Sequence, residues 1–325
     1  MSVARTAWRA AALACAALLA SMSAVAADAY PSRPIRFIVP IGPGSSGDTM
    51  TRTFAEHLRK VAGQSTLVEN RPGAELSLGT QVALSAPADG YTVVLISPSA
   101  TVINPLFVKD LPYRPEDLLP MLNVTRHVAV LVASVSSPYK SLGDVVAAAR
   151  RDQGGVSLAT YGNSYRLGAL DLARRAGVNF NQVPYKGAAQ AVADVVGGSV
   201  DLALIDIAGA APLVASGKIR ALAVAGDQRH PLLPDVATVQ ESGYPGYSLY
   251  IFIGFAIHAK TPPAVAGKLE DMMRQVMDDP ALRAQLAQQS GGEVVGAGSK
   301  EFSRMIQAEA VRYGELARLV GGGSP

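Results

Sequence analysis

A run of glycines and serines at residues 42–48 is the stretch of the sequence best suited to bind a ligand. Gly42, Gly44 and Gly47 follow an apolar, β-branched run at residues 35–39, and apolar residues then recur at helical spacing. This pattern predicts a strand, a turn whose glycines let the backbone approach a ligand, and a helix. The first N–H groups of a helix have no intrahelical partner and the helix dipole is positive there. We therefore expect an anion at this turn.

The spacing Gly42-x-Gly44-x-x-Gly47 also matches the dinucleotide-binding fingerprint, with Glu69 at the end of the next expected strand. An exported dinucleotide-dependent oxidoreductase is therefore an alternative interpretation, and a plain tight connection between strand and helix is another. Against the dinucleotide, a proline and an isoleucine separate the strand from the first glycine, where the fingerprint requires an immediate turn. No lysine follows the last glycine, which excludes a phosphate-binding P-loop.

Other residues that could do chemistry are scattered. No histidine has metal-ligand or nucleophile spacing with another His or Cys, and no Gly-x-Ser-x-Gly elbow is present. The histidines are His57, His127, His230 and His258. Asp201 and Asp206 lie at opposite ends of one expected strand, so a catalytic pair is disfavoured; Asp201 is expected to be a turn residue, whereas Asp206 could reach a cleft. We expect His57 to be solvated. The sequence offers no catalytic constellation, so we do not expect an enzyme.

The composition describes an exported chain. Two arginines and an apolar run open the sequence and small residues follow at cleavage spacing. We predict a signal peptide at residues 1–27, cleaved near Ala26 or Ala27, and hence a periplasmic protein. The only cysteine, Cys15, lies in this run, where a lipid anchor is the alternative. Without the signal peptide the chain has no thiol, no basic run and nearly zero net charge, so we do not expect nucleic acid or a membrane surface as partner.

The chain is long enough for two lobes, with 325 residues of which 49% are hydrophobic. Strands are expected at residues 35–39, 66–69, 91–96, 128–133, 156–160, 180–184, 202–205, 219–225 and 250–257. Helices are expected at residues 76–85, 142–151 and 188–196, and residues 97–101 are expected to form a loop. Strands that alternate with helices predict an α/β fold with a parallel sheet. Two such series would bring their helix-opening loops together across a cleft.

Several motifs are spread in order along the mature chain. In the first half they are Tyr30-Pro31-Ser32-Arg33-Pro34-Ile35, Val39-Pro40 with the loop to Asp48, Glu69-Asn70-Arg71-Pro72-Gly73-Ala74, Asp89-Gly90-Tyr91-Thr92 and Asn104-Pro105. In the second half they are Val183-Pro184-Tyr185-Lys186-Gly187, Gly197-Gly198-x-Val200-Asp201, Leu233-Pro234-Asp235-Val236 and Gly243-x-Pro245-Gly246-Tyr247. With these motifs the chain resembles the solute-binding receptors of tripartite tricarboxylate transporters, the TctC or Bug-type proteins.

The resemblance implies a two-lobe α/β periplasmic-binding-protein fold of type II, with the ligand in the interlobe cleft and two strands, 128–133 and 250–257, crossing between lobes. Lobe 1 would comprise residues 28–129 and 251–325, and lobe 2 residues 130–250. It implies capture of a small carboxylate, such as a di- or tricarboxylate, an acidic amino acid or a related organic acid. No cofactor is expected. A monomer would deliver the acid to integral-membrane permease subunits, and a ligand sensor for a membrane kinase is the alternative.

The resemblance also implies which residues hold the ligand. On lobe 1 these are Ser45, Ser46, Gly47, Asp48, Ser97, Ser99 and Thr101. On lobe 2 they are Tyr161, Gly162, Asn163, Ser164, Arg166, Tyr185, Lys186 and Gly187, with Asp206 as the cleft aspartate. The chain departs from the family pattern at Asn163, where serine is usual, and at Arg166, where histidine is usual. Gly42 replaces a proline and Gly47 a hydroxyl residue. We predict where the pocket lies but not which acid it binds. The Arg166 side chain is expected to face either the cleft or the solvent.

Overall fold

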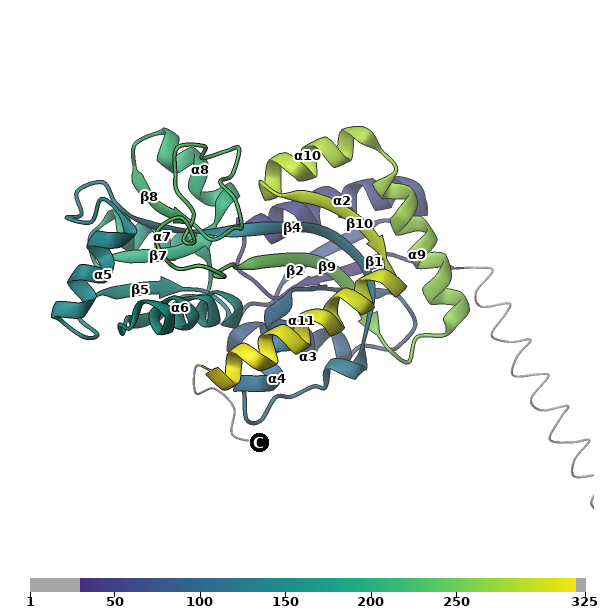
Figure 1. Ribbon diagram of the computed structural model, residues 1–325. Coiled ribbons are helices and arrows are strands. Elements are labelled where there is room, and N and C mark those ends of the chain that lie inside the picture. The colour runs from purple at the N-terminus through teal and green to yellow at the C-terminus, as the bar shows by residue number, and fades with distance from the viewer. Residues whose placement is uncertain (1–29, 320–325) are drawn as a thin grey trace, which may run out of the picture.

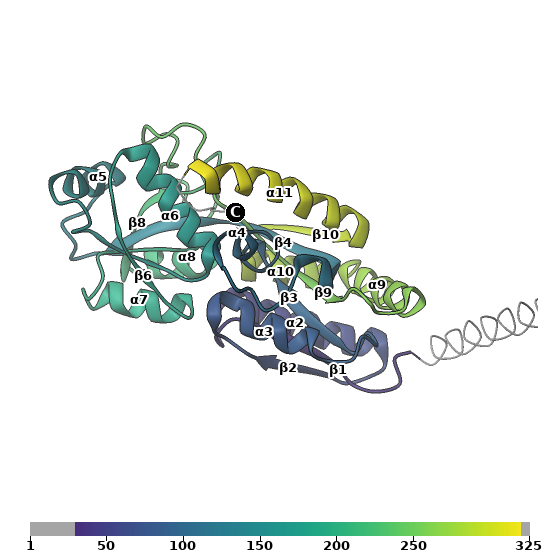
Figure 2. The same cartoon turned by 90° about the horizontal axis from the view of Figure 1, so that it is seen from below.

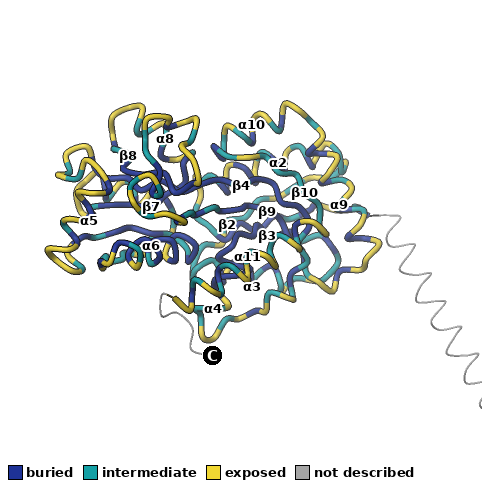
Figure 3. Tube along the Cα trace, in the orientation of Figure 1, coloured by how far each residue is buried: buried dark blue, intermediate teal, exposed yellow. Residues whose placement is uncertain are grey.

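The computed structural model describes residues 30–319 of the chain. The signal peptide predicted at residues 1–27, with Cys15, lies outside the described residues. Ten strands form one continuous, strongly curved sheet with helices on both sides (Figure 1). The strands in the middle of the sheet are deeply buried, whereas those at its edges are only partly buried (Figure 3). The order of eight strands is β2-β1-β3-β9-β4-β7-β5-β6, and β8 and β10 pair with β4.

The first part of the sheet is parallel, as predicted. Strand β1 (Ile35–Val39) lies between β2 (Thr66–Asn70) and β3 (Thr92–Ile96). Helix α2 (Ser46–Ala62) buries Phe54 against the sheet, where its ring lies 4.9 Å from that of Phe255. The apolar spacing of this helix therefore identifies the face that packs on the core, and its N-terminus is fixed at the carboxyl end of β1.

The second part of the sheet repeats this arrangement. Strand β5 (Ser157–Thr160) lies between β6 (Asn181–Pro184) and β7 (Leu202–Asp206), all parallel. The helices of this part are α5 (Leu142–Arg151), α6 (Asn163–Ala176), α7 (Ala188–Val196) and α8 (Ile207–Ala215). Helices α6 and α8 each begin directly after a strand, so their N-termini lie at the carboxyl ends of β5 and β7.

Two antiparallel strands join the two parts. Strand β4 (Leu118–Ser134) pairs with β9 (Tyr250–His258) along its first eleven residues, 118–128, and with β7 and β8 (Ile219–Val224) along 129–134. The structure therefore contains the two crossing strands, although β4 begins ten residues before the expected start at 128. Its first half, which contains Pro120, Asn123 and Thr125, lacks the continuous apolar pattern by which a buried strand is recognised.

The C-terminal part of the chain covers the first part of the sheet. It comprises α9 (Pro263–Met277), α10 (Pro280–Ser290), β10 (Glu293–Gly298) and α11 (Ser299–Leu319). Strand β10 pairs antiparallel with β4 and was not expected from the sequence. Helix α11 runs along the outside from the first part toward the second (Figures 1 and 2), and the Tyr313 hydroxyl donates to the Tyr250 carbonyl at 3.3 Å.

Two predicted segments differ in the structure. The helix expected at residues 76–85 spans Ser77–Leu84 (α3), and a 3₁₀ turn η1 (Ala74–Leu76) precedes it with positive φ values of 46°, 52° and 72°. The loop expected at 97–101 instead leads into a π-helical turn η2 (Ser99–Ile103) and then α4 (Asn104–Phe107). The predicted lobe boundaries near residues 129 and 250 remain predictions; both fall where β4 and β9 cross between the two parts.

Candidate functional site

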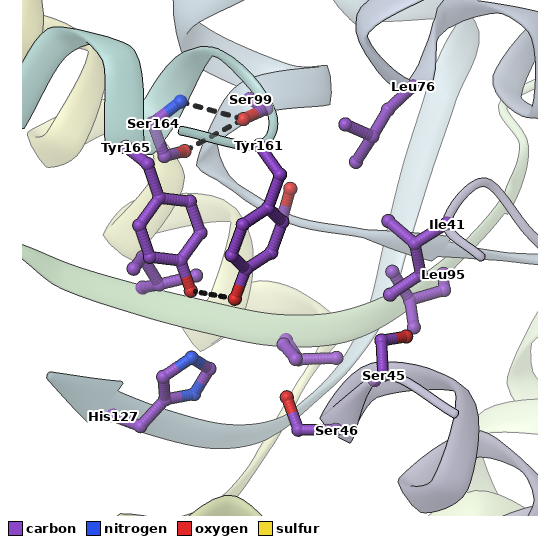
Figure 4. Close-up of a pocket in the computed structure, with 14 residues that line it drawn as sticks. Ile41, Ser45, Ser46, Leu76, Leu95, Ser99, His127, Tyr161, Ser164 and Tyr165 are labelled. Carbon is purple, nitrogen blue, oxygen red and sulfur yellow. Dashed lines mark hydrogen bonds between the residues drawn. The ribbon is translucent and has the colours of Figure 1, made fainter. Parts of the chain in front are cut away.

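A cavity of about 50 Å³ lies where the two parts of the sheet meet (Figure 4). Its walls come from the N-terminus of α2, the end of β3, the two crossing strands and the N-terminus of α6. The lining residues are Ile41, Ser45, Ser46, Gly47, Leu76, Leu95, Ser97, Ser99, His127, Tyr161, Ser164, Tyr165, Ile251 and Ile253. The structure thus brings together seven of the predicted site residues: Ser45, Ser46, Gly47, Ser97, Ser99, Tyr161 and Ser164.

The N-terminus of α2 forms the first wall. Ser45 is the N-cap: its hydroxyl donates to the Gly42 carbonyl at 3.0 Å and accepts from the Asp48 N–H at 3.3 Å. The next two N–H groups of the helix, those of Ser46 and Gly47, belong to residues that line the cavity. They carry the positive end of the helix dipole, which favours a negatively charged group there.

Asp48 does not line this cavity and stabilises the glycine-rich turn instead. Its carboxylate accepts from the Gly44 N–H at 3.0 Å, from Asn70 at 2.8 Å and from Arg52 at 3.1 Å. Burial alone would raise the pKa of Asp48, but these donors outweigh it and hold the pKa below its usual value. The residue therefore fixes the shape of the glycine-rich turn, a role that its sequence position did not indicate.

The N-terminus of α6 forms the opposite wall and contacts the first part of the chain directly. The Ser164 N–H donates to the Ser99 hydroxyl oxygen at 2.9 Å, and the two hydroxyls are also 2.9 Å apart. Asn163 donates to the Asn104 side-chain oxygen at 2.8 Å. All four side chains are buried. The structure is therefore closed at this seam, with a serine hydroxyl bound to the α6 N–H group that could otherwise bind a ligand.

Two stacked tyrosines connect the cavity to Asp206. The rings of Tyr161 and Tyr165 are 4.2 Å apart and their hydroxyls 2.8 Å apart (Figure 4). Tyr161 donates to the Asp206 carboxyl at 2.8 Å, and Asp206 also caps α8 by accepting from the Gly209 N–H at 2.8 Å. Burial first, and the nearby Asp206 second, raise the pKa of both tyrosines well above its usual value, so both hydroxyls stay protonated.

His127 is a lining residue that sequence reasoning did not select. It lies on β4 and is 3% exposed, and its Nδ1 atom has no hydrogen-bond partner among residues 30–319. Burial lowers the pKa of His127, while the negative charge of Asp206 acts in the opposite direction. Strand pairing causes this proximity, because Ala129 and Asp206 are opposite one another in the β4–β7 register. The available sequence signal was a histidine that directly precedes a fully apolar run.

Three neighbouring cavities take up most of the remaining predicted residues. Asp206 lines one of about 460 Å³, which shares Ser45 and Ser46 with the first cavity. Tyr161, Gly162, Tyr185 and Lys186 line another of about 160 Å³. Arg166 is exposed and lines a third, of about 440 Å³, with Glu75, Gly162 and Gln182 among its walls.

Thr101, Asn163 and Gly187 line none of these four cavities. The Thr101 hydroxyl donates to the Ser97 carbonyl at 3.0 Å, and Gly187 precedes the first residue of α7. Other polar residues also have structural partners. Asp201 accepts from both the N–H and the hydroxyl of Ser157, and His57 lies 3.3 Å from Asp279 and is largely shielded, not solvated as expected.

Within residues 30–319, no three His, Cys, Asp or Glu side chains are arranged to hold a metal ion. No helix among these same residues is long and apolar enough to cross a membrane.

Residues 50–321 match the model of the family described as "Tripartite tricarboxylate transporter family receptor". The chain belongs to this family. A similar relative is Protein BugT of Bordetella pertussis, 32% identical over 301 residues, which are 91% of this chain and 92% of that protein. The receptor fold and the solute-binding class predicted from the motifs are thereby confirmed.

Solved structures are also similar. "R. palustris Rpa4515 with adipate" has a TM-score of 0.85 and 26% identity, covering 90% of this chain and 98% of that one. "MatC (Rpa3494) from Rhodopseudomonas palustris with bound malate" has a TM-score of 0.83 and 26% identity, covering 90% and 100%. Both of these neighbours were solved with a small carboxylic acid.

Proposed function

We propose that the protein captures a small carboxylate between its lobes in the periplasm and delivers it to the membrane subunits of a tripartite tricarboxylate-type transporter. It acts without catalysis and as a monomer. Lobe 1 comprises residues 28–129 and 251–325, and lobe 2 residues 130–250. The observation that carries the proposal is the meeting of two helix N-termini, those of α2 and α6, at one buried cavity.

The chemistry of the lining supports an anion with an apolar body. Two helix dipoles point their positive ends at the cavity, and the serine hydroxyls around it are neutral donors. Five lining residues, Ile41, Leu76, Leu95, Ile251 and Ile253, are apolar. Neutral donors suit a receptor that must release its ligand, because they hold a carboxylate less tightly than a cage of cations would. The acids in the adipate and malate complexes of similar receptors have the same general chemistry.

Native mass spectrometry of the purified protein tests whether it retains an acid, and absorbance tests whether it retains a nicotinamide. Calorimetry then measures the affinity for acetate, butyrate, benzoate, succinate, malate, adipate, citrate and aspartate. The matched variants are Ser46→Ala, at the cavity, and Ser216→Ala, on the exposed end of α8. We expect Ser46→Ala to weaken binding by about 1–3 kcal/mol, roughly 5- to 150-fold, and Ser216→Ala to leave it unchanged.

Failure of every acid to bind would refute the carboxylate proposal, and a retained nicotinamide would favour the oxidoreductase alternative. If wild type and Ser46→Ala bind the acid with equal affinity, the N-terminus of α2 is not part of the binding site. A pull-down with solubilised membranes tests whether the partner is a transporter or a kinase. The captured membrane protein is identified from the masses of its peptides.

A further inference from the structure

The first cavity lacks a fixed positive charge. Among its fourteen lining residues, none is Lys, Arg, Asp or Glu. A buried carboxylate left without charge compensation is costly, and the partial charges at two helix ends compensate for it only in part. The tyrosines stay neutral at any physiological pH because their pKa values are raised. In this lining His127 is the side chain that can become a cation near neutral pH.

The surroundings of His127 do not satisfy the hydrogen-bonding capacity of its imidazole. Its imidazole lies below the rings of Tyr161 and Tyr165 and beside Ser46 (Figure 4). The Nδ1 atom is buried and has no hydrogen-bond partner in the described part of the chain, which costs free energy unless a ligand or water supplies one. The His127 side chain is more than nine-tenths buried and lines the cavity, which is a second indication of a ligand that is independent of the helix N-termini.

The charged groups near His127 belong to β7 and to β4 itself. On β7 the Asp206 carboxyl faces it, and this negative charge favours the imidazolium. On β4 itself, the guanidinium of the adjacent Arg126 lies 4.0 Å from the centre of the Tyr250 ring, and the backbone of Gly292, which directly precedes β10, lies close to the Cα and Cβ atoms of His127. In the empty cavity burial prevails and lowers the pKa of His127, so the imidazole is neutral at pH 7.

We propose that His127 binds the captured acid directly and takes up a proton from solvent as the acid enters. The products are an imidazolium and a carboxylate joined by a hydrogen bond, with no covalent change. This inference rests on the proposed function, since it assumes a carboxylate in this cavity. It explains how a lining without Lys or Arg compensates a buried negative charge, and it makes capture depend on pH.

The sign of the dependence follows from linkage. The bound state holds one proton more than the empty state between the low pKa of the empty receptor and the higher pKa of the complex. In that window affinity rises as pH falls, by up to about tenfold per pH unit for one proton. A single carboxyl group titrates near about pH 4, but the last carboxyl of a di- or tricarboxylic acid titrates higher. The ionisation of the free acid between pH 6 and 8 is therefore measured separately and subtracted from the proton uptake.

The test is calorimetry of wild type with the tightest-binding acid of the panel, in phosphate and in Tris buffers of different ionisation enthalpy. We expect uptake of about one proton at pH 7 and a rising affinity toward pH 6. His127→Gln keeps hydrogen-bonding capacity without ionisation, so both effects should vanish in it. His258→Gln, changed at the end of β9, should behave as wild type.

Binding without proton uptake in wild type overturns the inference and leaves the proposed function standing. Proton uptake that persists in His127→Gln also overturns it. If His127→Gln does not fold, the imidazole nitrogen chemical shifts of labelled wild type with bound acid decide. The shifts of the two ring nitrogens lie close together in an imidazolium and far apart in a neutral imidazole, and a neutral His127 in the complex would overturn the inference. If no acid of the panel binds, the inference and the proposed function are both refuted.

Discussion

The hydrogen bonds of Ser99 across the seam allow a quantitative prediction. Its hydroxyl oxygen accepts from the Ser164 N–H at 2.9 Å and is bonded to the Ser164 hydroxyl at the same distance. Ser99→Ala removes both bonds and leaves the Ser164 N–H buried without an acceptor in the closed, empty receptor. Each net hydrogen bond contributes about 1 kcal/mol, so the closed form loses about 2 kcal/mol relative to the open form. The closed-to-open ratio should fall about thirtyfold.

Distances between spin labels on the two lobes measure this ratio. Lys60→Cys on α2 and Lys218→Cys after α8 place labels at exposed positions. The empty Ser99→Ala protein should show a longer and broader distance distribution than wild type. A saturating acid should reduce the difference, because its carboxylate supplies the acceptor for Ser164. Ser216→Ala is the control. An unchanged distribution in the empty Ser99→Ala protein would refute the idea that these bonds hold the lobes together.

Three further predictions concern single residues. Because the pKa of Asp48 is depressed, its stabilising effect is present above its unfolded pKa of about 4 and is lost as pH falls through the folded value. Urea unfolding of wild type and Asp48→Asn should therefore differ at pH 7 and converge in acid. Gly47→Ala places a Cβ 2.7 Å from Ile41 Cδ1 and 3.2 Å from Leu95 Cδ1. The added methyl group should therefore occupy the cavity and lower the affinity for the acid by about tenfold or more. In thermal unfolding, the free energy of unfolding should change by less than the free energy of binding does. Arg166→His should leave the order of preferred acids unchanged, since Arg166 is exposed and lines another cavity; a changed order in calorimetry would assign it to the site.

The strands expected from the sequence include fully buried ones and also β2 and β6, which are only partly buried. β7, with all five residues buried, reads as a continuous apolar run. β10 could not be predicted, because it contains two glycines, is only partly buried, and exists by pairing with β4. The left-handed residues Ala74–Leu76 carry no glycine signal; Asn104, whose side chain donates to the Glu75 carbonyl at 2.7 Å, holds this turn from a distant position.

The site was predictable where it depends on local sequence. The glycines and serines before α2 and α6 indicate open helix N-termini, and both termini reach the cavity. What could not be predicted depends on tertiary pairing. Asp48 lies within the motif but bonds to Asn70 from another strand, and His127 becomes buried near Asp206 through the β4–β7 register. The spacing of residues along the sequence predicts neither contact.

The packing under the end of α11 has a practical consequence for building a biosensor. Tyr313 of α11 shares a buried apolar cluster with Val102 and Ile103 of the first part and with Leu167 of α6. The end of this helix therefore rests on both sides of the seam, and any relative movement of the two sides must disturb its packing. A fluorescent protein fused after α11 would have its attachment point at a place whose geometry changes with ligand occupancy, whereas a fusion to α5, at the far end of the molecule, would move with one side alone (Figure 1).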